Sequence, residues 1–70
     1  MNDLKIQICS DVDYENLIAE IYCDDRFIGL ISQENAVGEY MVEFPKAIPP
    51  ISYEWLLNAL QTAKLKLSGK

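Results

Sequence analysis

The chain contains no histidine, only two cysteines, three glycines, and fewer basic than acidic residues. Without histidine, no Ser-His or Cys-His nucleophile pair and no histidine metal ligand can form. Cys9 and Cys23 alone cannot complete a tetrahedral zinc site, and Gly29, Gly38 and Gly69 lie too far apart for a glycine-rich phosphate loop. These absences predict a protein that is not an enzyme and has no catalytic residue, cofactor or metal site.

Two cysteines do not make the disulfide framework of a small secreted domain, so both are expected to be buried, reduced side chains. The first eleven residues lack the basic segment and apolar core of a signal peptide, and no apolar run is long enough to cross a bilayer. We therefore expect a cytoplasmic protein that does not contact a membrane.

The charge is strongly one-sided, because 11 acidic residues outweigh 6 basic residues and give a net charge of −5. Such a surface repels the phosphates of nucleic acids, so no nucleic-acid partner is expected. Two alternatives remain: the charge keeps a small domain soluble, or it recognises a basic protein. The acidic surface candidates are Asp11, Asp13, Glu15, Glu20, Asp24 and Asp25, with Glu34 and Glu39 as further acidic positions.

The spacing of Asp11, Asp13 and Glu15 matches part of a calcium loop. The glycine and the terminal bidentate glutamate of an EF-hand are missing, so calcium binding is not predicted. Glu20 and Glu43 could in principle form a pair of carboxylates for acid-base chemistry, but nothing in the sequence places them in a deep pocket.

Seventy residues make one domain, 1–70. Apolar alternation predicts four strands, over residues 3–9, 17–23, 26–34 and 39–44. Ser52 is a good N-cap for a helix over 53–67, and Gly69 can end that helix in a left-handed conformation. The fold class is therefore α+β: a four-stranded antiparallel meander sheet with one C-terminal helix packed on one face (ββββα). The apolar stripe predicted for the helix consists of Tyr53, Leu56, Leu57, Leu60, Ala63 and Leu67.

The hairpin between the second and third strands turns at Asp24-Asp25. If this is a two-residue loop, the pairs are Cys23 with Arg26, Ile21 with Ile28 and Ala19 with Leu30. The core residues would then be Leu17, Ala19, Ile21, Ile28 and Leu30. Asp-Asp lacks the glycine that a type I′ turn prefers, so a longer loop that includes Arg26 remains open and would swap the faces of the third strand.

One helix can cover only one sheet face, so the other face carries a surplus of apolar residues. We expect either a homodimer or a protein partner on this face, the alternative being a monomer that tolerates a modest patch. The interface candidates are Ile18, Tyr22, Phe27, Ile31 and Met41.

Trp55 lies at the start of the predicted helix, close to Pro49 and Pro50. It either forms an aromatic-proline ledge for a peptide or packs on the crossover loop as a lid for the core, and we favour the lid.

Three segments, LIAEIYCDDRFIGLISQE, MVEFP and ISYEWLLNALQTAK, resemble a group of small uncharacterised bacterial proteins with an apolar hairpin, a short strand and one helix. The resemblance covers nearly the whole chain and implies a protein like an immunity protein or a phage-encoded inhibitor. No functional residue carries over, and Asp24-Asp25-Arg26 departs from the glycine-containing turn of the group. We therefore expect a small acidic, non-catalytic protein-interaction protein, with a self-associating structural module as the alternative.

Overall fold

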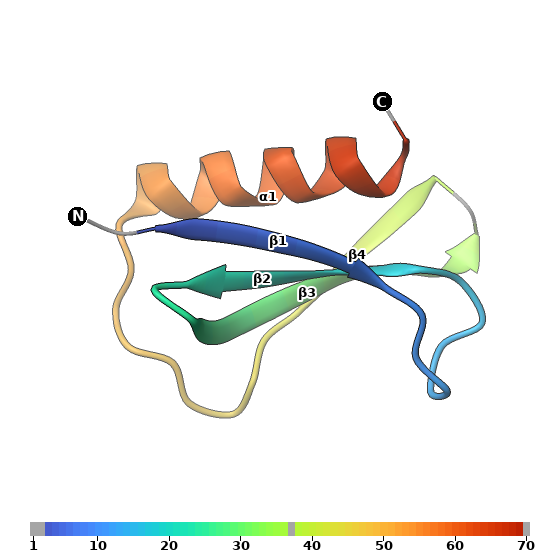
Figure 1. The fold of residues 1–70 in the computed structure, drawn as a ribbon, viewed down its shortest axis with the longest axis horizontal. Coiled ribbons are helices and arrows are strands. Elements are labelled where there is room, and N and C mark those ends of the chain that lie inside the picture. The colour runs from blue at the N-terminus through green and yellow to red at the C-terminus, as the bar shows by residue number, and fades with distance from the viewer. Residues whose placement is uncertain (1–2, 37, 70) are drawn as a thin grey trace.

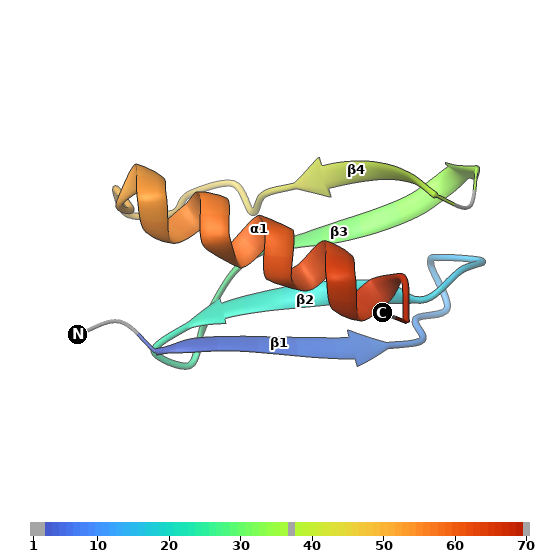
Figure 2. The ribbon, with the colours of Figure 1, turned by 90° about the horizontal axis from the view of Figure 1, so that it is seen from above.

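The computed structural model describes residues 3–36 and 38–69. Four antiparallel strands form one open sheet in the order β1-β2-β3-β4, and a C-terminal helix packs on one face of it (Figures 1 and 2). The elements are β1 Leu4–Cys9, β2 Ile18–Cys23, β3 Arg26–Ala36, β4 Glu39–Glu43 and α1 Tyr53–Leu67. This confirms the predicted ββββα architecture. Within the described ranges, no helix has the length and apolar character needed to cross a membrane.

The β2–β3 hairpin turns through two residues, Asp24 and Asp25, whose φ angles are 51° and 68°. Positive φ at both central positions is what a type I′ turn requires, and it places Cys23 opposite Arg26. The Asp24 Oδ1 atom accepts a 2.7 Å hydrogen bond from the backbone N–H of Asp3, and the Asp24 N–H donates to the Asp3 carbonyl at 3.0 Å. The two-residue turn is confirmed, and it is tied to the start of β1.

A β-bulge interrupts this hairpin just beyond the turn. Tyr22 lies opposite Phe27, but Ile21 lies opposite Gly29, so Ile28 is an extra residue on β3. Both Ile28 and Ile21 are about 1% exposed and belong to the same core cluster. The predicted pairing of Ile21 with Ile28 is therefore displaced by one residue.

The displacement exchanges the faces of the following β3 residues. Ile31 pairs with Ala19 and is 3% exposed in the core, whereas the interface prediction placed it on the opposite face. Leu30 pairs with Glu20 and leaves the core to which it was assigned. Both corrections have one cause, because a one-residue shift in register moves every later side chain to the other face.

Helix α1 begins where the sequence predicted. The Ser52 hydroxyl accepts a 3.3 Å hydrogen bond from the Trp55 N–H, and Gly69 has a φ of 80° just after the helix. The helix packs chiefly on β2 and β1 and less on β3, crossing the sheet obliquely (Figure 2). Its buried residues are Ala59, Ala63 and Leu67.

The buried stripe of the helix is rotated relative to the prediction. Tyr53 and Leu57 were assigned to it but are 78% and 44% exposed, whereas Ala59 is fully buried and Trp55 is partly buried against the core. Two alanines one turn apart, Ala59 and Ala63, let the helix backbone approach the sheet closely, so the stripe centres on them and not on the larger leucines. The core cluster comprises Ala19, Ile21, Ile28, Ile31, Ala59, Ala63 and Leu67.

Replacing Asp25 by glycine should stabilise the protein, because glycine occupies the left-handed region without the cost that a side chain incurs there. We expect Asp25→Gly to raise the free energy of unfolding by about 0.5 to 1 kcal/mol, measured by equilibrium urea unfolding. Asp24→Gly is the matched control: it relieves similar strain but loses the hydrogen bond from Asp3, so its gain should be smaller. Equal gains would contradict a capping role for the Asp24 carboxylate.

Replacing Gly29 by alanine should destabilise the protein. A Cβ atom there would lie 3.0 Å from the Glu43 carbonyl oxygen and 3.2 Å from Phe44 Cδ1. We expect Gly29→Ala to lower the free energy of unfolding by about 1 to 3 kcal/mol, since β4 must move away from β3. Adding Phe44→Ala should not restore stability, because the backbone oxygen remains in place. Full rescue by that second change would show that only the ring resists the methyl group.

Candidate functional site

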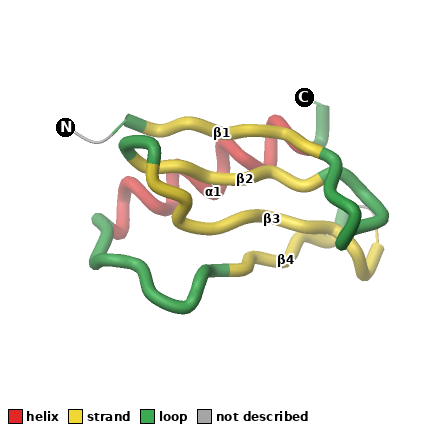
Figure 3. The backbone as a smooth tube through the Cα atoms, turned by 60° about the horizontal axis from the view of Figure 1, so that its bottom comes forward, coloured by secondary structure: helices red, strands yellow, loops and turns green. Residues whose placement is uncertain are grey.

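The strongest candidate site is the sheet face opposite α1, which we call the second face. Figure 3 shows this face toward the viewer, with the helix behind the sheet. Side chains alternate between faces along each strand, with a change of phase at the β3 bulge. The second face therefore consists of Lys5, Gln7, Cys9, Ile18, Glu20, Tyr22, Phe27, Leu30, Ser32, Met41 and Glu43.

Two carboxylates share the middle row of the second face. Gln7 lies opposite Glu20, Glu20 opposite Leu30, and Leu30 opposite Glu43, so one row crosses all four strands. Neighbouring strands are about 4.8 Å apart, which places the backbones of Glu20 and Glu43 about 10 Å apart with Leu30 between them. Glu20 is half-buried and Glu43 is exposed.

An aromatic pair lies beside this row, toward the hairpin turn. The rings of Tyr22 and Phe27 meet edge to face, with centroids 5.7 Å apart and an interplanar angle of 65°. The Tyr22 hydroxyl donates a 3.0 Å hydrogen bond to Glu20 Oε1, and the ammonium of Lys5 lies 5.9 Å from the centre of the Tyr22 ring. Tyr22 thus links the cation on β1 to the carboxylate on β2.

A second tyrosine reaches the face from the β1–β2 loop. The Tyr14 hydroxyl lies 3.1 Å and 3.3 Å from the two carboxylate oxygens of Glu43 and donates to them. The Ser32 hydroxyl donates to Glu43 Oε2 at 3.3 Å. Each carboxylate of the middle row therefore accepts a hydrogen bond from a phenol.

The β1–β2 loop is fixed to the end of β3 by further hydrogen bonds. The backbone N–H groups of Glu15 and Asn16 donate to the Glu34 carboxylate at 2.7 and 2.9 Å, and the Asn16 side-chain amide donates to the Gln33 carbonyl at 3.1 Å. The loop hangs below the sheet on the side away from α1 (Figure 1). It therefore covers one end of the second face.

The most buried residues of the second face lie at the end that the β1–β2 loop covers. Ile18 is 1% exposed and Ser32 is 3% exposed, although the one helix of the described residues packs on the other face. Leu17, which was assigned to the core, is 49% exposed and lies just before β2, and it is not part of the core cluster. The exposed side chains of the face are Lys5, Gln7, Met41 and Glu43, whereas Glu20, Tyr22, Phe27 and Leu30 are half-buried.

The phenols and thiols near the face are held in their neutral forms. Partial burial and the hydrogen bond to Glu43 raise the pKa of Tyr14, and the hydrogen bond to Glu20 followed by partial burial raises the pKa of Tyr22. Burial also raises the pKa of both thiols, helped by Glu20 at Cys9 and by Asp24 at Cys23. A protonated thiol is a poor nucleophile, so neither cysteine is activated for chemistry.

Both cysteines are free, but they are half-buried, whereas full burial was expected. Cys9 pairs with Ile18 on the second face, whereas Cys23 packs against the core cluster on the helix side. They lie on opposite faces of the sheet.

The five interface candidates divide into three groups. Tyr22 and Phe27 form a pair at the hairpin end of the second face, whereas Met41, which is 48% exposed, lies on the same face beyond the middle row, opposite Ser32. Ile18 lies on that face beneath the loop, and Ile31 lies in the core. Sequence reasoning missed the roles of Tyr14 and Ser32 at Glu43; the only available signal was that Tyr14 is the sole aromatic residue of an acidic segment.

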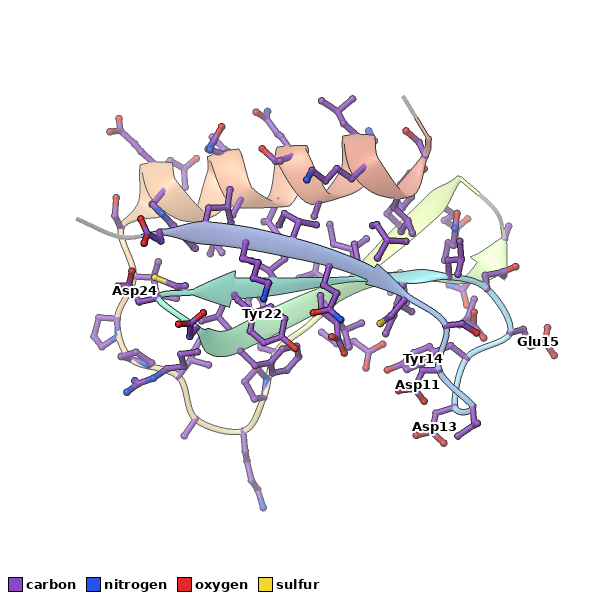
Figure 4. The ribbon with its side chains drawn as sticks, viewed as in Figure 1. Asp11, Asp13, Tyr14, Glu15, Tyr22 and Asp24 are labelled. Atoms are coloured by element: carbon purple, nitrogen blue, oxygen red, sulfur yellow. The ribbon has the colours of Figure 1, made fainter. Side chains whose placement is uncertain are left out.

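The acidic candidates do not form one patch. Asp11, Asp13 and Glu15 lie on the loop below one end of the sheet, and Asp24 lies at the opposite end (Figure 4). Asp11 Oδ1 accepts a 2.9 Å hydrogen bond from the Asp13 N–H, which is a local turn. Among the described residues, no group of three His, Cys, Asp or Glu side chains is placed to hold a metal ion.

A small pocket of about 290 Å³ opens at the hairpin end of the sheet. It is lined by Cys23, Asp24, Arg26, Ile28, Pro49, Pro50, Ile51 and Ser52. Its size is at the lower limit for a small-molecule site, and its charged groups are of opposite sign. Trp55 does not line it and instead packs against the core, which agrees with the lid interpretation.

No protein-family model matches the chain, and no curated protein or solved structure matches it significantly.

Stability should fall at high pH because of the two tyrosines on this face. In the unfolded chain they release their protons at about pH 10, whereas in the folded protein their raised pKa keeps them protonated to higher pH. Their contribution is therefore complete below about pH 10 and is lost as the pH rises through the folded-state pKa. Tyr14→Phe should make this alkaline loss smaller and cost about 1 kcal/mol at neutral pH.

The measurement is urea unfolding over a series of alkaline pH values. Tyr53→Phe is the matched control, since it removes a hydroxyl from a side chain that is 78% exposed. If Tyr14→Phe and the parent protein lose the same free energy of unfolding at alkaline pH, Tyr14 does not contribute to this loss.

Proposed function

We propose that this protein acts by binding, without catalysis of its own, and that its second face recognises a basic segment of another protein in the manner of an immunity protein or inhibitor. The observation that carries the proposal is the middle row, in which Glu20 and Glu43 flank Leu30 on a face that α1 does not cover.

Both carboxylates are held in place and still have acceptor capacity. An ionised carboxylate offers about four lone-pair sites, and the phenols of Tyr22 and Tyr14 use only some of them. Because these phenols are neutral, they orient the carboxylates without neutralising them. A guanidinium or ammonium group from a partner would meet acceptors that are already positioned, which reduces the entropy lost on binding.

The surroundings of the carboxylates favour a cationic partner that also carries apolar groups. Within the described part of the second face, Lys5 is the one basic residue, and it lies over Tyr22. The Tyr22 ring already faces Lys5, and the neighbouring Phe27 ring offers surface on which an arginine or lysine can lie in a cation–π contact. Met41 adds an exposed apolar side chain on β4.

A second copy of the chain fits this face less well. A two-fold interface brings the same patch of each copy together, so the carboxylates of Glu20 and Glu43 would be desolvated against like charges. The like charges therefore favour a basic partner over the homodimer that the apolar residues alone suggested.

The proposal is tested by titrating the protein with an arginine-rich and a lysine-rich decapeptide while following its backbone amide NMR signals. We expect shifts at the second face, affinity that weakens with salt, and an affinity about tenfold lower for Glu20→Gln/Glu43→Gln. Asp24→Asn/Asp25→Asn is the control, because it changes the net charge equally at the hairpin turn, outside the middle row, and keeps an oxygen for the Asp3 N–H.

If both double variants weaken peptide binding equally, the loss of affinity comes from net charge alone and the proposal is wrong. Sedimentation of the free protein supplies the second readout: a stable dimer that Phe27→Asp disrupts would favour the self-associating module instead.

A further inference from the structure

We propose that the partner's basic segment binds as a fifth strand along the free edge of β4, with basic and apolar side chains alternating along it. The inference rests on the proposed function and specifies the conformation and pattern of the partner.

The first observation is a free sheet edge. β4 is the last strand in the order, and no described residue pairs with its outer side (Figures 2 and 3). Every second residue of an edge strand points its N–H and C=O groups away from the sheet, where an extended segment can pair with them.

The second observation is an uncovered apolar area on the helix side of this edge. Because α1 packs chiefly on β1 and β2, it leaves Val42, Phe44 and Leu57 at 42%, 49% and 44% exposure, and we call these three residues the β4 shoulder. The ammonium of Lys64 lies 5.7 Å from the centre of the Tyr40 ring, so this flank of α1 faces β4. Leu57 lies two turns before Lys64, on the same flank.

The third observation is the opposite character of the other side of the edge. Met41 and Glu43 point to the second face, where Glu43 accepts hydrogen bonds from Tyr14 and Ser32. A strand added about 4.8 Å from β4 would place alternate side chains over the β4 shoulder and beside Glu43. The first set must be apolar and the second basic.

The charges also favour a basic segment over a second copy of the chain, and the edge of β4 over the edge of β1. A second copy pairing its β4 antiparallel about Met41 would put Glu39 opposite Glu43, a like-charge contact. The other edge strand, β1, carries Lys5 on its second face, which repels a basic segment, and its Leu4 and Ile6 already pack against the core. An alternating cationic strand therefore fits β4.

The test uses two capped heptapeptides of the same composition, one with lysine and valine alternating and one with the lysines and valines in separate blocks. We expect the alternating peptide to bind about tenfold more tightly and to slow amide hydrogen exchange in β4. Val42→Lys should abolish this preference, because it places a cation in the β4 shoulder. Ile8→Lys is the matched control, since it makes the same change at a 37% exposed position on β1.

The outcomes separate the two proposals. If both peptides bind equally and Glu20→Gln/Glu43→Gln weakens both, the basic-partner function stands and the fifth strand is wrong. Protection that appears in β1 and not in β4 also overturns the fifth strand. If neither peptide binds, both proposals fail.

Discussion

The close packing of Ala59 and Ala63 on β1 and β2 is the contact on which the rest of the structure depends. Both side chains are fully buried, and their small size brings the helix axis close to the sheet. The molecule measures 33 × 26 × 17 Å, and its described residues form two layers, one sheet and one helix. The single helix lies on one face of the sheet, so within the described residues no layer covers the second face. Because it packs chiefly on β1 and β2, it covers β4 only in part.

The second face compensates for the missing layer with polar contacts. On the helix side, side chains are buried by apolar packing; on the other side, Ile18 is buried beneath a loop held by hydrogen bonds to Glu34 and Glu43. Such bonds are directional and each contributes little net free energy, so they fix the position of the loop more than they stabilise the fold. The same bonds orient Glu43, which makes the loop part of the candidate site.

The sequence was sufficient to predict the architecture, but not to predict which side chains lie on which face of the sheet and of the helix. Alternation located the four strands, and Ser52 and Gly69 marked the ends of the helix, because these signals depend on a few neighbouring residues. The helix stripe was misplaced because periodicity weighs leucine more than alanine, whereas close approach to the sheet favours Ala59. The contact between Tyr14 and Glu43 joins residues 29 apart in the chain, and no local pattern encodes it.

The bulge at Ile28 was the main source of error, and its one signal was Gly29, an isolated glycine inside a strand pattern. Gly29 is buried with no space for a methyl group beside β4, which explains why glycine follows the extra residue. With that signal applied, Leu30 and Ile31 would have been assigned to the correct faces.

The bulge has a consequence for how the core and the candidate site are related. Beyond Ile28, the inward positions of β3 are Gly29, Ile31 and Gln33, and the outward positions are Leu30 and Ser32. If all residues were kept but the strands paired without a bulge, Ile28 would lie opposite Ile21 and each of these side chains would lie on the opposite face. The bulge thus determines at once which side chains of β3 hold the helix and which are presented to a partner, so a change of pairing there would exchange both sets together.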